Sequence, residues 1–337
     1  MPCYHPQGGW RAPNGKLTKD KANARSGEEL TIPCGTCIGC RVERTRSWAI
    51  RCSHENAFHD EAMFITLTYR DRDLPWDGSL DQEAITLFIR RLRKRTGKKI
   101  RYFGCGEYGD KTSRPHYHLI VWGHWFPDAE FHAMSPAGHR LYLSRHLERL
   151  WPYGMSNFGE VTYQSAAYTA RYIMKKFIGP DSDQHYMTDL EKLDQETGEL
   201  TPIIKTPEYI RMSKRPGIGY EWITRYYKDV YPSDFIIHDG KKHPVPKYYD
   251  KIYEAIDPDG MARVREAREQ FAEEHAEDST RSRLDDREFC KSVQLEQLKR
   301  EIDHHETESI RSSRQRSRGI PTAVFPAHGR HRKKDIR

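Results

Sequence analysis

The sequence predicts an α+β fold, with helices packed on one face of an antiparallel sheet. Four short segments rich in β-branched and aromatic residues, and bounded by turn residues, are typical of strands. Three amphipathic segments lie between and after them, so the order β-α-β-β-α-β-α is typical of a split βαβ, or ferredoxin-like, arrangement. The predicted strands are 62–69, 99–109, 116–123 and 155–163, and the predicted helices are 79–97, 135–151 and 164–178.

The first strand, 62–69, shows the alternation most clearly. Phe64, Thr66 and Thr68 share one side of the sheet, while Ile65, Leu67 and Tyr69 share the other.

Helix and turn signals bound the next elements. Ser79 or Asp81 is a cap residue for the helix 79–97, and Gly97 ends that helix. The polar stretch 110–115 then joins the second and third strands as a hairpin loop.

Composition divides the chain of 337 residues, whose formal net charge is +7 and hydrophobic content 36%. Such a composition predicts a moderate core with long polar extensions. From 261 the chain is charged and poor in apolar residues, which predicts an exposed helix or disorder, and its basic tail predicts a nucleic-acid-binding arm. The predicted segments are a Cys-rich segment with a basic helix (1–60), a central domain (61–235) with a polar hairpin insertion (181–207), and a charged extension (236–337).

Compartment and membrane association follow from what the sequence lacks. No apolar run approaches the ~20 residues of a membrane helix, and the first residues, MPCYHPQGGW, do not read as a signal peptide. We expect a cytoplasmic protein with reduced cysteines and no membrane partner.

Three of the seven cysteines lie close together, at Cys34, Cys37 and Cys40. Thiolates at this spacing can wrap one zinc ion, and Cys3 is the natural fourth ligand, with His5 and Cys52 as substitutes. An iron–sulfur cluster would require a further cysteine followed by a proline just after Cys40, but Arg-Val-Glu follows Cys40 instead. A cysteine-rich turn without metal is the alternative.

His116 and His118 lie two residues apart in a predicted strand, so both imidazoles point to one face. Glu107 ends the preceding strand, across the hairpin from His116. Two imidazoles and one carboxylate with open positions suit Mg²⁺ or Mn²⁺ that also binds phosphate oxygens. The alternative is an exposed, polar strand face with Leu119 and Val121 on the core side.

Tyr168 and Tyr172 lie four residues apart in a predicted helix, so their phenols share one face, together with Lys175. Ala166 and Ala170 belong to the opposite, apolar stripe, which can pack on the sheet. Taken alone, the two tyrosines would be interpreted as solvent-facing residues of an amphipathic helix. Taken together with the histidine strand, they are predicted to be nucleophiles for phosphoryl transfer.

Basic residues gather near these motifs, and such clusters neutralise phosphates. The residues predicted to bind DNA are Arg91 and Lys94 in the helix 79–97, Arg114 beside the first histidine, and Arg171 and Lys176 beside the tyrosines.

Several motifs carry a resemblance to a known family. The HYH triplet resembles the metal motif of HUH endonucleases, and YTARYIMKK resembles the two-tyrosine motif of the superfamily that includes microvirus initiators. The six motifs given below, in their order and spacing, resemble those of the replication initiators of the gokushovirus branch of the microviruses. The motifs are PCGTCIGCR (33–41), FITLTY (64–69), GEYG (106–109), RPHYH (114–118), YTARYIMKK (168–176) and RMSKRPGIGYEW (211–222).

The resemblance implies a rolling-circle initiator in the cytoplasm of a bacterial host. Glu107, His116 and His118 would hold the metal, and Tyr168 or Tyr172 would attack the scissile phosphate, giving a 5′-phosphotyrosine and a free 3′-OH. The second tyrosine would later cut the regenerated junction, and Lys175 would stabilise charge or shuttle a proton. Implied partners are single-stranded DNA, supercoiled origin DNA, and the host replication polymerase and helicase.

Two other functions stay open. Another HUH enzyme, a two-tyrosine transposase or a relaxase, is one; relaxases usually carry a third histidine, and Ile120 occupies that strand position here. A zinc-containing nucleic-acid-binding protein without catalysis is the other.

Overall fold

The computed structural model shows two compact units, Met1–Ser292 and Val293–Arg337. The elements below belong to the first unit, and the predicted boundaries at 60 and 235 both fall inside it. The structure describes residues 3–13, 17–23, 30–109, 112–135, 138–171, 182–193 and 200–297.

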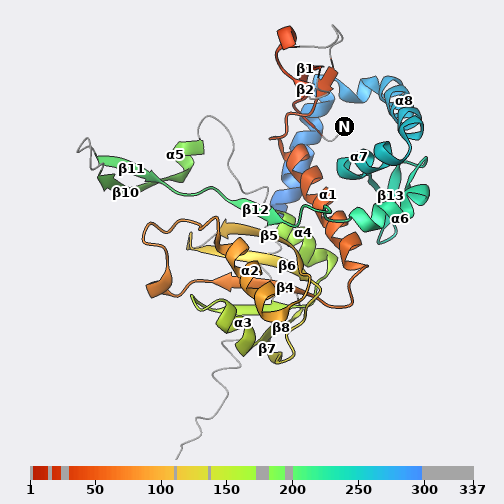
Figure 1. Ribbon diagram of the computed structural model, residues 1–337. Coiled ribbons are helices and arrows are strands. Elements are labelled where there is room, and N and C mark those ends of the chain that lie inside the picture. The colour runs from red at the N-terminus through yellow and green to blue at the C-terminus, as the bar shows by residue number, and fades with distance from the viewer. Residues whose placement is uncertain are drawn as a thin grey trace, which may run out of the picture. The chain divides into compact units, whose positions relative to one another are not determined.

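A seven-stranded sheet, ordered β12-β5-β6-β4-β9-β8-β7, forms the centre of this unit (Figure 1). Every neighbouring pair in it is antiparallel, which confirms the predicted antiparallel sheet. Its strands are β4 (Ala62–Thr68), β5 (Arg101–Tyr108), β6 (Pro115–Trp122), β7 (Glu130–Met134), β8 (Arg140–Leu143), β9 (Ser156–Gly159) and β12 (Tyr209–Met212).

Two helices, α2 (Ala84–Thr96) and α3 (Arg145–Leu150), pack on one face of the sheet. Their apolar side chains form the main core with the alternate residues of β4 and β6 that point to this face. The helix α2 ends as predicted at Gly97, whose φ of 67° is left-handed and whose N–H binds Arg93 O.

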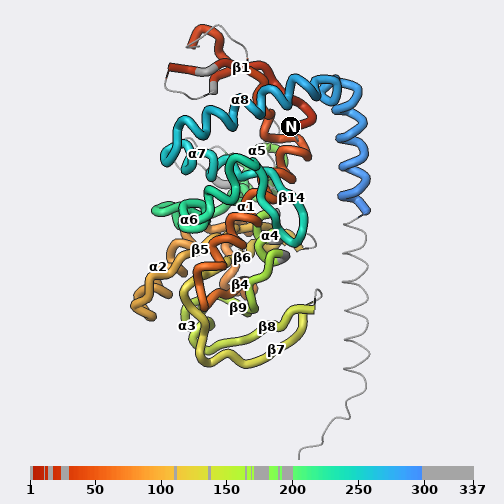
Figure 2. Tube along the Cα trace, turned by 90° about the vertical axis from the view of Figure 1, so that its right-hand side faces the viewer, coloured from red at the N-terminus to blue at the C-terminus, as the bar shows by residue number. Residues whose placement is uncertain are grey.

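The expectation that helices cover only one face is wrong. The opposite face is covered by α1 (Ile38–Asn56) and α4 (Tyr163–Arg171), and Figure 2 shows α2 and α4 on the two sides of the strands. The physical reason lies in β6, where Ile120 is as fully buried as its neighbour Leu119. Successive strand residues point to opposite faces, so both faces of β6 need an apolar cover.

The predicted helix 135–151 is also wrong over its first half. Residues 140–143 form β8, in which Tyr142 pairs with Phe158 of β9. Helix α3 begins only after Ser144, whose hydroxyl accepts the Leu147 N–H. Leu143, Leu147 and Leu150 share one helical face, whereas Leu141 and Leu143 share one face of a strand, and pairing with β9 selects the strand for 140–143.

The insertion forms the predicted hairpin, β10 (Met187–Leu193) and β11 (Leu200–Ile204), which projects away from the sheet (Figure 1). A short helix, α5 (Ser182–Tyr186), precedes it. The strand β12 then joins the sheet edge beside β5, which the sequence did not predict.

A second core lies beyond the sheet, where Ile50 of α1 packs with the C-terminal elements. Helix α1 is tied to this layer and to β5 by buried Glu55, which binds Arg101 and accepts the Gly219 N–H. Among the described residues, no helix is both long and apolar enough to cross a membrane. The elements of this layer are α6 (Tyr220–Val230), β13 (Phe235–His238), β14 (Lys241–Pro244), α7 (Lys247–Ile256) and α8 (Pro258–Glu274).

The two ends of the first unit are shorter elements. At the N-terminus, β1 (Gln7–Arg11), β2 (Leu17–Thr18) and β3 (Leu30–Ile32) form a small sheet. After α8, residues 281–292 are helical, so the charged segment is an exposed helix in the part that the structure describes.

Candidate active site

The carboxylate of Glu107 and the imidazoles of His116 and His118 meet near the hairpin, where β5 ends and β6 begins. Register places Glu107 directly opposite His116. Oε1 of Glu107 lies 2.6 Å from Nε2 of His116 and 3.1 Å from Nε2 of His118. One ligand atom from each residue lies within 4.8 Å of the others, so the hairpin brings the three side chains together.

The second ring nitrogen of each histidine has a partner of its own. Nδ1 of His116 lies 3.1 Å from Arg114 O, and a carbonyl only accepts, so Nδ1 carries a proton and Nε2 is the nitrogen that would bind a metal. Nδ1 of His118 lies 3.1 Å from the Thr66 hydroxyl. Such contacts fix the tautomer and orientation of imidazoles that bind metals.

Thr66 is a residue that sequence reasoning did not assign to the site. The alternation of the strand 62–69 placed it on one side with Thr68, but nothing in the sequence gives the register of β4 against β6. In that register Thr66 lies opposite His118. Phe64, two residues earlier, stacks on the His118 ring with centroids 5.4 Å apart.

Burial and charge together determine the ionisation of Glu107, which is 1% exposed. Burial alone would raise its pKa, but the hydrogen bonds and charges of His116 and His118 outweigh burial and lower the pKa. The site therefore offers a carboxylate anion whose Oε1 lies 2.6 Å from Nε2 of His116. A contact this short needs a proton or a cation between the two atoms, and a hard divalent ion fits the donor set in place of that proton.

The tyrosine helix packs on the same face of the sheet as the histidines. Ala166 and Ala170 are fully buried against Ile120 and Trp122 of β6, which confirms the predicted apolar stripe at these two positions. Trp122 and Ile120 alternate with Leu119 and Val121, so they share the face of His116 and His118. Helix α4 thus covers the sheet beside the metal-type residues.

Tyr168 and Arg171 belong to α4, but the structure does not describe their side chains. Tyr172, Lys175 and Lys176 fall among residues 172–181, which lie outside the described residues altogether. The tyrosine and lysine roles thus stay predictions.

The other residues predicted to bind DNA differ in their surroundings. Arg114 donates to Asp71 at 2.6 Å and to Tyr69 O at 3.0 Å. Arg91 is held in α2 by hydrogen bonds to Leu150 O and to the Tyr153 hydroxyl, whereas Lys94 is exposed. Since α2 packs on the opposite face of the sheet, Arg91 and Lys94 lie across the sheet from the histidines.

The cysteines form a second cluster with the ligand set that the sequence predicted. The Sγ atoms of Cys3, Cys34, Cys37 and Cys40 all lie within 4.8 Å of one another. Cys3 and Cys34 each accept a backbone N–H, from Cys34 at 3.2 Å and Cys37 at 3.3 Å. Burial would raise the pKa of Cys34, but backbone N–H donors lower it to about 6, which favours a thiolate.

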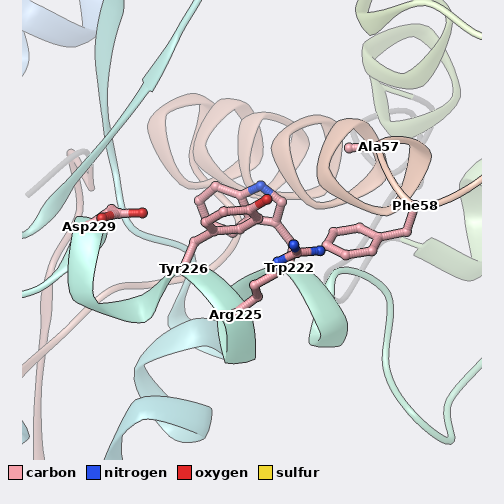
Figure 3. A pocket seen from close by; sticks show the side chains of 6 residues that line it. All are labelled: Ala57, Phe58, Trp222, Arg225, Tyr226 and Asp229. Carbon is pink, nitrogen blue, oxygen red and sulfur yellow. The ribbon is translucent and has the colours of Figure 1, made fainter.

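A pocket of about 250 Å³ lies elsewhere, between the C-terminal end of α1 and helix α6. In Figure 3 the Arg225 guanidinium lies beside the Phe58 ring, and aromatic side chains form the wall. None of the predicted site residues that the structure describes lines it. The lining residues are Ala57, Phe58, Trp222, Arg225, Tyr226 and Asp229.

One protein family and several individual proteins are similar to this chain in sequence. The family model described as Replication-associated protein ORF2/G2P matches residues 62–177, which contain both the histidine strand and the tyrosine helix. Replication-associated protein VP4 of Bdellovibrio phage phiMH2K is 33% identical over 270 residues, covering 77% of this chain and 79% of the relative. Replication-associated protein ORF2 of Spiroplasma virus 4 is 32% identical over 256 residues, covering 72% and 73%.

No solved structure matches the chain. The extent of the match to the Bdellovibrio phage protein, together with the family model, shows that the chain belongs to the family of replication-associated proteins, ORF2/G2P, of these small phages.

Proposed function

We propose that this protein initiates rolling-circle replication by nicking the origin strand of its phage genome and later rejoining it into a circle. The observation that carries the proposal is the meeting of Glu107, His116 and His118 on the face of the sheet against which α4, the helix of Tyr168, packs. Membership in a phage replication family supplies the substrate class.

Glu107, His116 and His118 would hold Mg²⁺ or Mn²⁺, which when bound supplies positive charge beside the scissile phosphate. The Tyr168 or Tyr172 phenolate oxygen attacks phosphorus, and the bond from phosphorus to the 3′ oxygen breaks. The products are a 5′-phosphotyrosine and a 3′-OH that primes a host polymerase. Lys175 donates a proton to the leaving oxygen or neutralises charge.

Rejoining reverses this chemistry. After one circuit the second tyrosine cuts the regenerated junction and releases a new 3′-OH. That hydroxyl attacks the first phosphotyrosine, a phosphodiester forms, and the phenol regains its proton. The product is a single-stranded circle.

The proposed partners are single-stranded DNA, the supercoiled origin, and the host polymerase and helicase in the bacterial cytoplasm. Arg114 lies next to His116, and its ion-pair partner Asp71 is 93% exposed. Solvent screens such a pair, so Arg114 can exchange Asp71 for a DNA phosphate at little cost. Arg171 and Lys176 would bind phosphates beside the tyrosines.

We further propose that the four-cysteine cluster holds structural Zn²⁺. Tetrahedral zinc with bonds of about 2.3 Å separates its sulfurs by roughly 3.8 Å. The sulfurs of Cys3 and Cys37 lie 3.9 Å apart. A soft, four-thiolate site and a hard carboxylate–imidazole site select different metals, so zinc here would take no part in nicking.

A covalent-adduct assay tests the nickase. The purified protein is incubated with the supercoiled replicative circle and Mn²⁺, and DNA attached to protein is sought under denaturing conditions. We expect a metal-dependent adduct that persists in Tyr168→Phe and in Tyr172→Phe but is absent from the double variant. Origin binding without nick or adduct would instead favour the zinc-containing, non-catalytic DNA-binding protein.

A further inference from the structure

The four-cysteine cluster is linked through residues 4 and 5 to a helix at the opposite end of the first unit. Tyr4 links the two, because its N–H points to Cys37 Sγ at 3.4 Å while its carbonyl accepts a hydrogen bond from Arg281 at 3.1 Å. Tyr4 thus lies between the cysteines and residues 281–292.

His5 adds two more contacts to the same helix. Its Nε2 lies 2.7 Å from Oε2 of Glu288, and its Nδ1 lies 3.2 Å from Nη1 of Arg281. Glu288 only accepts and Arg281 only donates, so a neutral imidazole protonated at Nε2 satisfies both. The three residues form one consistent hydrogen-bonded network.

The helix presents a single face to this network. Arg281, Leu284 and Glu288 follow the spacing i, i+3 and i+7, which places them on one side of a helix. Leu284 is 4% exposed, whereas Arg283 on another side is exposed. Through Arg281 and Glu288 this face contacts Tyr4 and His5 of the N-terminal segment.

The polar contacts alone are weak, since the His5 side chain is 46% exposed and Glu288 is 28% exposed. Exposed pairs contribute little stability, so the docked state depends on a fixed platform. Residues 3–5 form that platform, and Cys3, as a zinc ligand, would hold it in place. Without metal, weak sulfur hydrogen bonds to Cys34 and Cys37 would hold Cys3 in place of a zinc bond, and the platform would loosen.

We infer that zinc in the four-cysteine cluster clasps the helix 281–292 against residues 3–5, so that metal occupancy controls the docking of this helix. This inference rests on the proposed zinc site and is independent of nicking. Zinc loss frees Cys3, then Tyr4 and His5, and the helix undocks.

Hydrogen exchange of the full chain tests the clasp, beside zinc content measured by elemental analysis. We expect one zinc per chain. Stripping it with an organomercurial followed by thiol should make amides of 281–292 exchange about tenfold faster, with little change in β4 to β6. Added Zn²⁺ should restore protection, and Mg²⁺ should not.

Two variants separate the clasp from the metal site. Arg281→Ala should keep its zinc yet show the faster exchange of 281–292, whereas the control Arg283→Ala should keep both zinc and protection. Absence of zinc would overturn the metal site itself. Bound zinc with exchange of 281–292 unchanged by stripping, or by Arg281→Ala, would overturn the clasp alone.

Discussion

The Thr66 hydroxyl and Nδ1 of His118 lie 3.1 Å apart across the β4–β6 pair. Because Nε2 of His118 faces Glu107, Nδ1 must carry the ring proton whenever the imidazole binds a metal. The Thr66 oxygen accepts that proton, which holds the ring in the metal-binding tautomer. Thr66 is therefore a positioning residue.

Thr66→Val should weaken Mn²⁺ binding about 10- to 100-fold, because the variant keeps the shape of the side chain and loses only the acceptor. Calorimetric titration of the variant with Mn²⁺ measures the change. Thr68→Val is the matched control, since the Thr68 hydroxyl donates to Met155 O and not to a histidine. Equal losses of affinity in the two variants would contradict the role assigned to Thr66.

A second prediction concerns the buried junction of α1, β5 and α6. Burial would raise the pKa of Glu55, but hydrogen bonds from His59, Arg101 and the Gly219 N–H outweigh burial and lower the pKa to about 2, from 4.5. A depressed carboxyl pKa contributes stability above the unfolded value, which is lost as pH falls through the folded value. The shift corresponds to roughly 3 kcal/mol.

Glu55→Gln should therefore lower the free energy of unfolding by about 3 kcal/mol at pH 7, since it also leaves Arg101 buried without its anion. The deficit relative to wild type should shrink as the pH drops from 4.5 towards 2. Urea unfolding of both proteins across this range measures it. A difference that stays constant with pH would show that the charge of Glu55 is not what stabilises the junction.

Local pattern predicted much of the site. Glu107 and His116 were expected to pair because a short hairpin joins their strands, and such a connection sets the register. The spacing of Cys34, Cys37 and Cys40 also predicted that these cysteines lie together, with Cys3 as the fourth member of the cluster. Thr66 could not be found, since a whole helix separates β4 from β5 and β6, and no local signal encodes their alignment.

The errors in the fold have a similar origin. The segment 135–151 fits both a helical and an alternating pattern, and β9, a partner later in the chain, selects the strand for residues 140–143. The second helical layer was missed because α1 precedes the β-α-β-β-α-β unit. Only the burial of Ile120 and Trp122 shows that this face also needs a cover.

The last prediction separates Arg91 from Lys94, which the sequence treated alike as DNA-binding residues. Arg91 binds Leu150 O and the Tyr153 hydroxyl, so Arg91→Ala should lower the free energy of unfolding by about 1–2 kcal/mol without changing DNA binding. Lys94 is exposed, so Lys94→Ala should leave stability unchanged, weaken DNA binding for any sequence and reduce the salt slope by about one. Thermal unfolding and filter binding at several salt concentrations measure the two effects. Equal reductions of the salt slope would mean that Arg91 leaves its contacts with Leu150 and Tyr153 to reach the DNA.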